Sequence, residues 1–320
     1  MLYCFVLYIG KPENAPITHK TMQKTVSSVD ASLLLMVTFI WGSNFVVMKL
    51  GLLDFAPLLI CFLRFTLSAL PLIFFIKKPA VPMQWVATNG LLIGCGQFGC
   101  LFLALQGEIA PGLASLLMQL QVFLTIIASS FVFSEKVSNR QTAGLLAAMA
   151  GLVLAGWHIG GDLTVRGLVL VLAATAFWAL SNLLVKQVSR QAAVKIDMLS
   201  FIAWSSFFSI LPLAVMVLLT VGPDVALQQL KAASWLGWSA VLWQALGNTL
   251  IGFGLWSFML AKYPASVVTP WALLVPIFGM TSSALYFGES FPPWKFAVFA
   301  LVMGGIALAS WPLRKKVVLA

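Results

Sequence analysis

Amide side chains stand inside long apolar stretches of this chain, where a polar group is costly to bury. An amide can donate hydrogen bonds to a carboxylate and accept one from an ammonium group. Together the amides suit a zwitterion, whereas each one alone would serve equally well as a hydrogen bond between helices. The set consists of Asn44, Gln97, Gln119, Gln121, Asn182, Gln244 and Asn248.

Two of these amides cannot both face the same direction on an α-helix. Gln119 and Gln121 are two positions apart, which separates their side chains by about 200° around the helix axis. We therefore expect at most one to face a central cavity, and we select Gln121. The candidate amide ligands are Asn44, Gln97, Gln121, Asn182 and Asn248.

Arg64 is a charged residue well inside an apolar stretch. A charge buried in a bilayer is expensive, so it is retained for a partner or a function. Two interpretations stay open: Arg64 attracts a substrate carboxylate, or it pairs with helix-end carbonyls, Asp54 or Asn44 and braces the helices. Lys49 lies near the end of its stretch and is expected to extend to the outer surface.

Several tryptophans also lie well inside apolar stretches, although membrane tryptophans favour the two interfaces. A buried indole can line a cavity and attract an ammonium group through a cation–π contact. The alternative for any single one is ordinary packing. From Trp41, Trp178, Trp204, Trp256 and Trp271, we select Trp41, Trp178 and Trp271 as candidate binding residues.

The residue types that enzymes use are missing from the apolar stretches. Every acidic residue lies in the N-terminal tail or at the end of a stretch, as do His19 and His158. A membrane-embedded enzyme would need clustered Asp or His, and Ser43 has no intramembrane histidine as its base. The cysteines Cys4, Cys61, Cys95 and Cys100 lack the spacing of metal ligands. We therefore expect no catalytic residue, no metal site and no cofactor.

Composition predicts the elements that position these residues. Of the 320 residues, 61% are hydrophobic and 9% are charged, whereas soluble domains carry about 25% charged residues. Lipid must therefore be the solvent, and continuous apolar stretches indicate helices, not an alternating β-barrel. The fold class is all-α, a polytopic membrane protein with spans expected at residues 31–53, 56–76, 84–106, 111–133, 140–158, 166–186, 197–221, 234–259, 264–287 and 293–312.

The basic residues predict an orientation. The chain has a formal net charge of +10, but the charges are scattered between apolar stretches, which excludes a nucleic-acid surface. One side of the membrane would receive most of them, and cytoplasmic loops carry the excess of Lys and Arg. Both termini are therefore expected in the cytoplasm. The other side would receive Lys49, Arg166, Lys231 and Lys295.

The two halves of the chain resemble one another. Pro111 and Pro264 each begin an apolar stretch, and these stretches end at Glu135 and Glu289. The offset is 153 residues at the prolines and 154 at the glutamates. The same offset of 154 relates residues 151–157 to residues 305–311 in the stretches that follow.

The openings of the halves match more loosely. Trp41 precedes Lys49 by eight residues, as Trp178 precedes Lys186. Each half would hold five spans, and because five is odd the halves would cross the membrane in opposite directions. Inverted repeats are typical of alternating-access transporters, which hold their substrate near mid-membrane between the repeats.

These segments resemble a known family. Residues 41–49, 63–65 and 111–116, with Glu135 and Glu289 at span ends, are similar to the EamA-type family of the drug/metabolite transporter superfamily. Within that family, residues 116–123, 203–205, 252–256 and 273–279 most resemble the bacterial exporters of O-acetylserine and cysteine. The resemblance implies a multi-pass inner-membrane secondary transporter that exports small polar amino-acid-like metabolites, such as cysteine or O-acetylserine.

The expected organisation follows from the repeat. It comprises a cytoplasmic tail (1–30), two five-helix repeats (31–158 and 159–313) and a basic cytoplasmic tail (314–320). The expected partners are a small-molecule substrate and the lipid bilayer, and both a monomer and a homodimer stay open. Besides the enzyme, a carrier of nucleotide sugars or phosphorylated metabolites is an alternative, but it would need several cavity lysines or arginines.

Overall fold

The computed structural model describes residues 26–192, 196–263 and 265–310. Within these ranges the secondary structure is helical, apart from isolated β-bridges that join Leu163 to Ile109 and Gly160. The predicted all-α class is confirmed for this part of the chain. The N-terminal tail up to residue 25 and the basic C-terminal tail lie outside the described residues.

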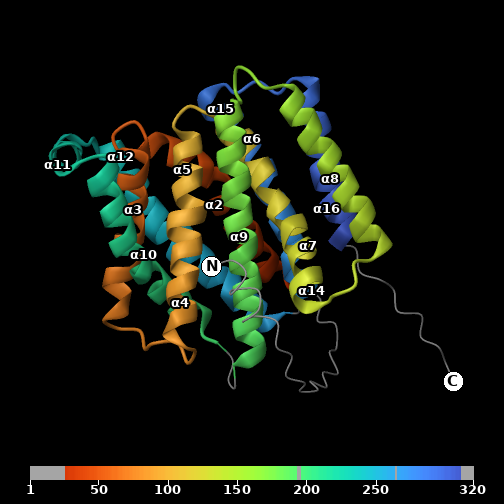
Figure 1. Cartoon of the computed structure of the whole chain (residues 1–320), viewed down its shortest axis with the longest axis horizontal. Coiled ribbons are helices and arrows are strands. Elements are labelled where there is room, and N and C mark those ends of the chain that lie inside the picture. The colour runs from red at the N-terminus through yellow and green to blue at the C-terminus, as the bar shows by residue number, and fades with distance from the viewer. Residues whose placement is uncertain (1–25, 193–195, 264, 311–320) are drawn as a thin grey trace.

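The helices follow one another with short connections (Figure 1). In chain order they are α2 (Ser28–Gly51), α3 (Pro57–Ile73), α4 (Met83–Gly90), the π-helix η1 (Leu91–Phe98), α5 (Gly99–Leu105), α6 (Pro111–Leu117), the 3₁₀-helix η2 (Met118–Leu120), α7 (Gln121–Phe133), α8 (Asn139–Trp157), α9 (Val165–Gln191), α10 (Met198–Thr220), α11 (Pro223–Ala232), α12 (Trp235–Leu242), the π-helix η3 (Trp243–Gly252), α13 (Phe253–Lys262), α14 (Ala265–Val268), the 3₁₀-helix η4 (Thr269–Leu274), α15 (Val275–Phe287) and α16 (Pro293–Ser310).

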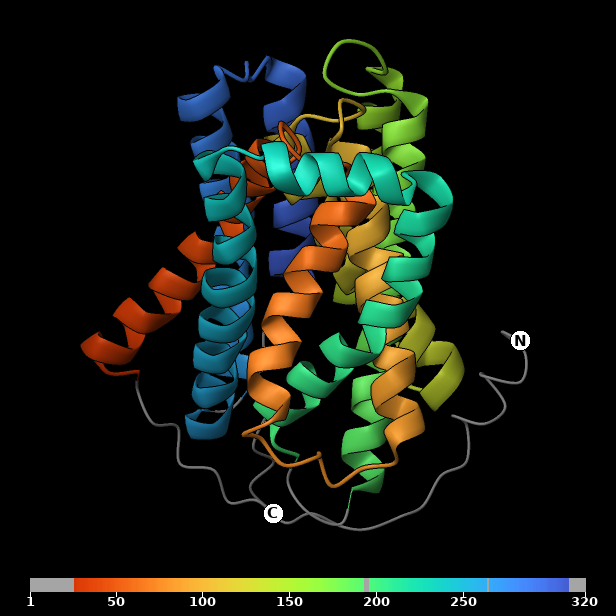
Figure 2. The same cartoon turned by 90° about the vertical axis from the view of Figure 1, so that its left-hand side faces the viewer.

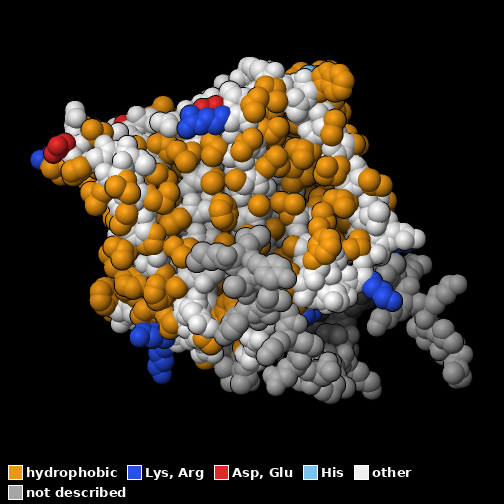
Figure 3. Space-filling view, viewed as in Figure 1, with side chains coloured by type: hydrophobic (Ala, Val, Ile, Leu, Met, Phe, Trp, Pro, Cys, Tyr) orange, Lys and Arg blue, Asp and Glu red, His pale blue; other side chains and the backbone are white. Residues whose placement is uncertain are grey.

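Among the described residues, seven helical stretches are long and apolar enough to cross a membrane. Pro57–Ile73 is a shorter apolar helix. In Figure 3 hydrophobic side chains cover the middle of the visible face, while charged side chains gather toward its upper and lower edges. The protein is therefore a polytopic membrane protein. The seven stretches are Ser28–Gly51, Met83–Leu105, Pro111–Phe133, Val165–Gln191, Met198–Thr220, Thr269–Phe287 and Pro293–Ser310.

Helix α11 lies crosswise over one end of the bundle of long helices (Figure 2). Two hydrogen bonds tie the α2–α3 connection to this region: the Ala56 N–H donates to Gln229 (2.9 Å) and the Ser234 hydroxyl donates to Asp54 (2.5 Å). This end of the bundle is termed the α11 end, and the other is termed the opposite end.

Close backbone approach joins α8 to α16, which stand together at one edge of the bundle (Figure 1). A Cβ atom built on Gly305 would lie 2.6 Å from the Gly144 carbonyl oxygen, and one built on Gly144 would clash with the Gly305 carbonyl. Both positions therefore require glycine. Such contacts between small residues are the usual means by which membrane helices associate.

Several helices begin directly after a residue whose side chain caps the first turn. Ser27, Thr164 and Ser234 each accept a hydrogen bond from a backbone N–H in the first turn of α2, α9 and α12. Ser138 forms a reciprocal capping box with Gln141 at the start of α8. These caps satisfy N–H groups that a helix leaves without an internal partner.

The long rods are interrupted at corresponding places in the two halves. The π-helices η1 and η3 interrupt the rods 83–105 and 235–262, and the 3₁₀-helices η2 and η4 interrupt the rods 111–133 and 265–287. The residues that follow α7 and α15, Ser134 and Gly288, both have left-handed backbone conformation, with φ of 53° and 66°. Glu135 and Glu289 come next in the chain.

Candidate functional site

A cavity of about 610 Å³ lies between the helices. Its lining comes from α2, α3, the segment 83–105 (α4, η1 and α5), the segment 111–133 (α6, η2 and α7), α9, α10, η3, α13, η4, α15 and α16. Met198 and Ser310, the first residue of α10 and the last of α16, both border it. Because α10 ends next to α11, these residues lie at the opposite end. The cavity thus extends from the middle of the bundle toward the opposite end.

Arg64 is the only charged residue among the described residues that line this cavity. Its side chain is 1% exposed. The guanidinium donates to the Gln244 Oε1 (2.8 Å) and the Thr249 Oγ1 (3.2 Å), and it lies 3.7 Å from the ring centre of Phe98. The π-helices η1 and η3 supply these partners. The guanidinium is thus positioned by neutral groups, and no carboxylate in the described structure neutralises it.

Three buried polar atoms near this site have no hydrogen-bond partner: the Arg64 Nε, the Gln244 Nε2 and the Asn44 Oδ1. Arg64 and Asn44 line the cavity, and Gln244 is the hydrogen-bond partner of Arg64. An unpaired buried polar group costs about 1–3 kcal/mol. The two unpaired donors would suit a carboxylate, and the unpaired acceptor would suit an ammonium group.

Aromatic side chains stand on the same side of the cavity as Asn44. Trp41 precedes Asn44 by three residues, which places both on one face of α2. The ring of Trp41 lies 5.0 Å from Phe253 and 5.1 Å from Trp256, between ring centres, and its indole N–H donates to the Asn248 carbonyl (3.4 Å). This aromatic wall could hold an ammonium group beside the free Asn44 oxygen.

Three further amides, Gln121, Asn182 and Asn89, are held by hydrogen bonds to one another or to hydroxyls. Asn182 donates to the Gln121 Oε1 (2.7 Å) and the Thr125 Oγ1 (3.2 Å). Asn89 accepts from the Ser181 hydroxyl (2.6 Å) and donates to Ser205 (3.2 Å). These groups link helices across the cavity wall, so they also brace the bundle.

The cavity brings together most of the predicted site residues. Trp271 lies outside its lining and packs beside Leu34 and Tyr263, because Thr269–Leu274 is a 3₁₀-helix with three residues per turn. Its neighbours occupy the two faces of η4 that border the cavity, and Trp271 occupies the third. The residues that do line the cavity are Trp41, Asn44, Arg64, Gln97, Gln121, Trp178, Asn182 and Asn248.

Other residues line the cavity although the sequence did not predict them as binding residues. Gln119 borders the cavity as well as Gln121, because Met118–Leu120 is a 3₁₀ turn and the α-helical separation of 200° does not hold there. Asn89 stands near the beginning of its span, where a polar residue carries little signal. The partners of Arg64 are Gln244 and Thr249, whereas Asp54 instead accepts from Ser234.

The sequence profile of the EamA-like transporter family matches residues 30–157 and 165–311. The chain belongs to this family.

Two relatives of this EamA-like protein carry the name "Probable amino-acid metabolite efflux pump". The one from Salmonella typhimurium is 38% identical over 91% of this chain and 98% of its own length. The one from Escherichia coli K12 is 34% identical over 90% of this chain and 97% of its own length. A solved crystal structure covers 88% of this chain and 98% of its own, with a TM-score of 0.54 and 19% identity, and shows a shared fold alone.

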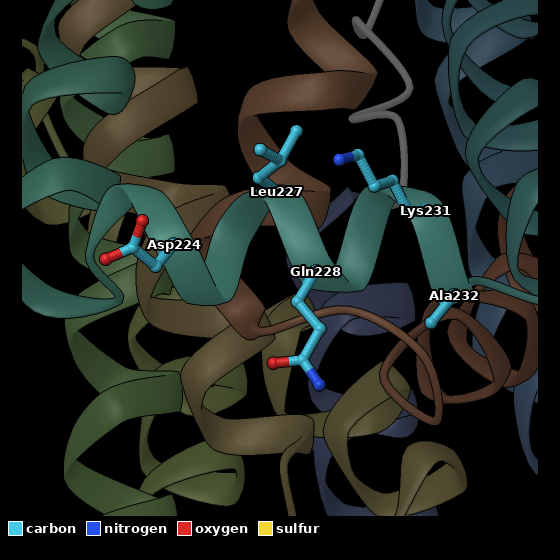
Figure 4. Close-up of a pocket in the computed structure, with 5 residues that line it drawn as sticks. All are labelled: Asp224, Leu227, Gln228, Lys231 and Ala232. Atoms are coloured by element: carbon cyan, nitrogen blue, oxygen red, sulfur yellow. The ribbon is translucent and has the colours of Figure 1, made fainter.

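The EamA-like chain has a second hollow of about 390 Å³ on α11. Asp224, Leu227, Gln228, Lys231 and Ala232 line it, and Figure 4 shows that all five come from this one short helix. A site supplied by a single surface helix cannot enclose a ligand. The cavity around Arg64 is therefore the candidate site of this EamA-like transporter.

Proposed function

We propose that this EamA-like transporter exports small amino-acid-like metabolites through the cavity around Arg64. The observation that carries the proposal is a cavity whose described lining holds one charged residue, the buried Arg64 with an unpaired Nε, together with an unpaired Asn44 oxygen beside an aromatic wall. Two relatives of nearly the same length are named for amino-acid metabolite efflux, which supports the same substrate class.

In the proposed binding mode Arg64 receives the substrate carboxylate, and Gln244 holds the guanidinium in place from behind the cavity wall. The ammonium group lies against Trp41 and donates to Asn44. The other amides, Gln97, Gln121, Asn182 and Asn248, with Trp178, line the path along which the substrate moves. A nucleotide sugar or phosphorylated metabolite would call for several cationic groups, and Arg64 alone supplies charge among the described lining residues.

Ten spans arranged as two inverted repeats of five, 31–158 and 159–313, form the proposed architecture. The corresponding π- and 3₁₀-helices support it. So do two corresponding links between helix ends: Asp30 at the start of α2 binds Lys262 at the end of α13 (2.8 Å), and Arg166 at the start of α9 binds Glu108 after α5 (3.2 Å). Glu108 and Lys262 are 154 residues apart.

Alternating access across the inner membrane is the proposed mechanism. The α11 end faces outward and the opposite end faces the cytoplasm, as the distribution of Lys and Arg favours. Both tails, 1–30 and 314–320, then lie in the cytoplasm. The cavity in this structure would load substrate from the cytoplasmic side, which is the side from which an exporter must take it.

Transport into inverted membrane vesicles tests the proposal. Vesicles that contain the protein should accumulate radiolabelled O-acetylserine or cysteine, measured with and without a protonophore. Arg64→Ala should lower the uptake by about tenfold or more, since a hydrogen bond to a charged group contributes about 1.5–3 kcal/mol. The matched control is Arg166→Ala, whose arginine is exposed and lies outside the cavity lining.

Uptake of neither compound, and of no member of a broad amino-acid panel, would refute the proposed function. Normal uptake by Arg64→Ala would remove the carboxylate-binding role and leave Arg64 as a brace between α3 and η3. Loss of uptake with the protonophore would assign coupling to the proton gradient or potential, and persistent uptake would assign downhill flow.

A further inference from the structure

Glu289 is buried at the α11 end, where it joins the two halves of the chain. Its side chain is 3% exposed. One carboxylate oxygen accepts from the Gly112 N–H at the start of α6 (3.0 Å) and from the Ser283 hydroxyl (2.5 Å). The other oxygen accepts from Lys295 (3.1 Å), which also binds Asp162 (2.7 Å). This network fastens α15 and α16 to α6 and closes that end of the bundle.

Glu135 holds the corresponding position at the opposite end but has different partners. It accepts from Lys186 (2.6 Å) and Arg190 (2.8 Å) on α9, and its side chain is 41% exposed. Burial raises the pKa of the Glu135 carboxyl, but the hydrogen bond from Lys186 and the charges of Lys186 and Arg190 outweigh this and lower it. Glu135 is thus an ionised carboxylate bound to the first helix of the other half.

The surroundings of the two glutamates match in a further respect. Lys186 lies 5.0 Å from the ring centre of Phe133, and Lys49 lies 5.2 Å from the ring centre of Phe287. Phe133 and Phe287 are 154 residues apart, as are the two glutamates. Lys49 therefore occupies beside Glu289 the place that Lys186 occupies beside Glu135. Yet among the described contacts Lys49 has no hydrogen bond or ion pair.

We propose that Glu289 exchanges its partners during transport. When the α11 end opens, Glu289 breaks its contacts with Gly112 and Lys295 and pairs with Lys49. Glu135 undergoes the reverse exchange and leaves Lys186 when the opposite end closes. Each glutamate thus pairs with the lysine of the other half when its own end is open, and gives up that lysine when its own end closes. The proposal rests on alternating access as proposed above, and it assigns Lys49 a role in the transport cycle.

Packing at the α11 end explains why release of Glu289 would open it. A Cβ atom on Gly112 would lie 2.7 Å from the Glu289 Oε2 and 3.1 Å from the Met280 Cα, so α6 and α15 touch along this seam. Further along, Gly279 packs against Ser115. At the opposite end the corresponding segments α7 and η4 do not pack along a comparable seam, and Thr125 and Pro270 both border the cavity. The two ends therefore show the closed and open forms of the same contact.

The test measures opening of the α11 end through a cysteine at Met280, which is 8% exposed and does not line the cavity. Met280→Cys is introduced after the four native cysteines are replaced by alanine, and the protein is placed in nanodiscs. A hydrophilic maleimide then reaches both faces. Leu113→Cys on α6, buried at the same end, serves if Met280→Cys does not fold.

Lys49→Met should slow labelling about two- to fivefold, because it removes the ion pair of the open form and a surface ion pair is worth up to about 1 kcal/mol. Lys49→Arg should label at the original rate. Lys186→Met should speed up labelling of the cysteine at position 280, since it weakens the form seen here, in which the α11 end is closed. The control Lys231→Met, on exposed α11, should have no effect.

An unchanged labelling rate in Lys49→Met would overturn the proposal. So would a shift in the same direction for Lys49→Met and Lys186→Met, or slowed labelling in Lys49→Arg equal to that in Lys49→Met. Labelling needs no substrate, so its outcome is independent of the transport test. Shifted labelling without amino-acid uptake would refute the proposed function alone.

Discussion

Arg64 shows how a charge is kept inside the bilayer without a counterion. Its guanidinium donates to Gln244 and Thr249 and lies against the face of Phe98, which spreads the charge over neutral partners. An arginine at the centre of a membrane helix costs about 2.5–3.5 kcal/mol on insertion scales. The Arg64 Nε stays unpaired and the site keeps a net positive charge. A carboxylate that enters loses hydrogen bonds to water, and the guanidinium replaces them with a charged donor.

Asn44 and Asn182 should respond differently to the same substitution. The Asn44 Oδ1 has no partner, so Asn44→Leu should reduce transport strongly without lowering the thermal unfolding midpoint. Asn182→Leu removes hydrogen bonds to Gln121 and Thr125, each worth about 0.6 kcal/mol in membrane proteins. It should lower the midpoint. Vesicle uptake and thermal unfolding in detergent measure the two effects.

A lower midpoint for Asn44→Leu, with transport reduced only in proportion to folded protein, would make Asn44 a packing residue. Equal midpoints for both variants would mean that the Asn182 bonds add nothing to stability.

At the scale of the elements, the contact between α8 and α16 depends on two glycines. Gly305→Ala places a methyl group 2.6 Å from the Gly144 carbonyl oxygen, whereas Gly304→Ala places one in open space. Overpacking of this kind costs about 1–3 kcal/mol. The Gly305 variant should therefore unfold at a lower temperature, followed by circular dichroism. The Gly304→Ala variant should unfold at no lower a temperature than the original protein, because alanine fits open space there and favours a helix more than glycine does. An equal loss in both variants would contradict the role of the Gly144 contact.

Continuous apolarity over about 20 residues predicts the all-helical class and the long apolar helices. The same signal does not predict what happens inside these helices. The π-helices η1 and η3 and the 3₁₀-helices η2 and η4 have no composition signature, and they decide which side chains turn inward. Trp271 and Gln119 were both misjudged relative to the cavity for this reason. The partners of Arg64 were equally inaccessible, since Gln244 lies 180 residues away.

For the molecule as a whole, the proposed orientation predicts the location of both ends of the chain. A green fluorescent protein fused after the last residue should fluoresce, and alkaline phosphatase inserted near α11 should be active. The physical reason is the excess of Lys and Arg on one side of the membrane. A dark C-terminal fusion together with inactive phosphatase near α11 would mean that the bundle has the opposite orientation. The cavity would then open outward and load substrate from outside the cell.

The separation of Arg64 from its partners has a consequence for biosynthesis. Gln244 and Thr249 follow Arg64 by 180 and 185 residues. At about 5–20 residues per second, the ribosome needs roughly 9–36 s to reach Gln244 after Arg64 has been made. During this interval α3 carries an unsatisfied guanidinium. The helix must therefore either stay at the translocon or pair its guanidinium with lipid headgroups. The nascent first half is then the stage at which quality-control proteases would degrade this protein most readily.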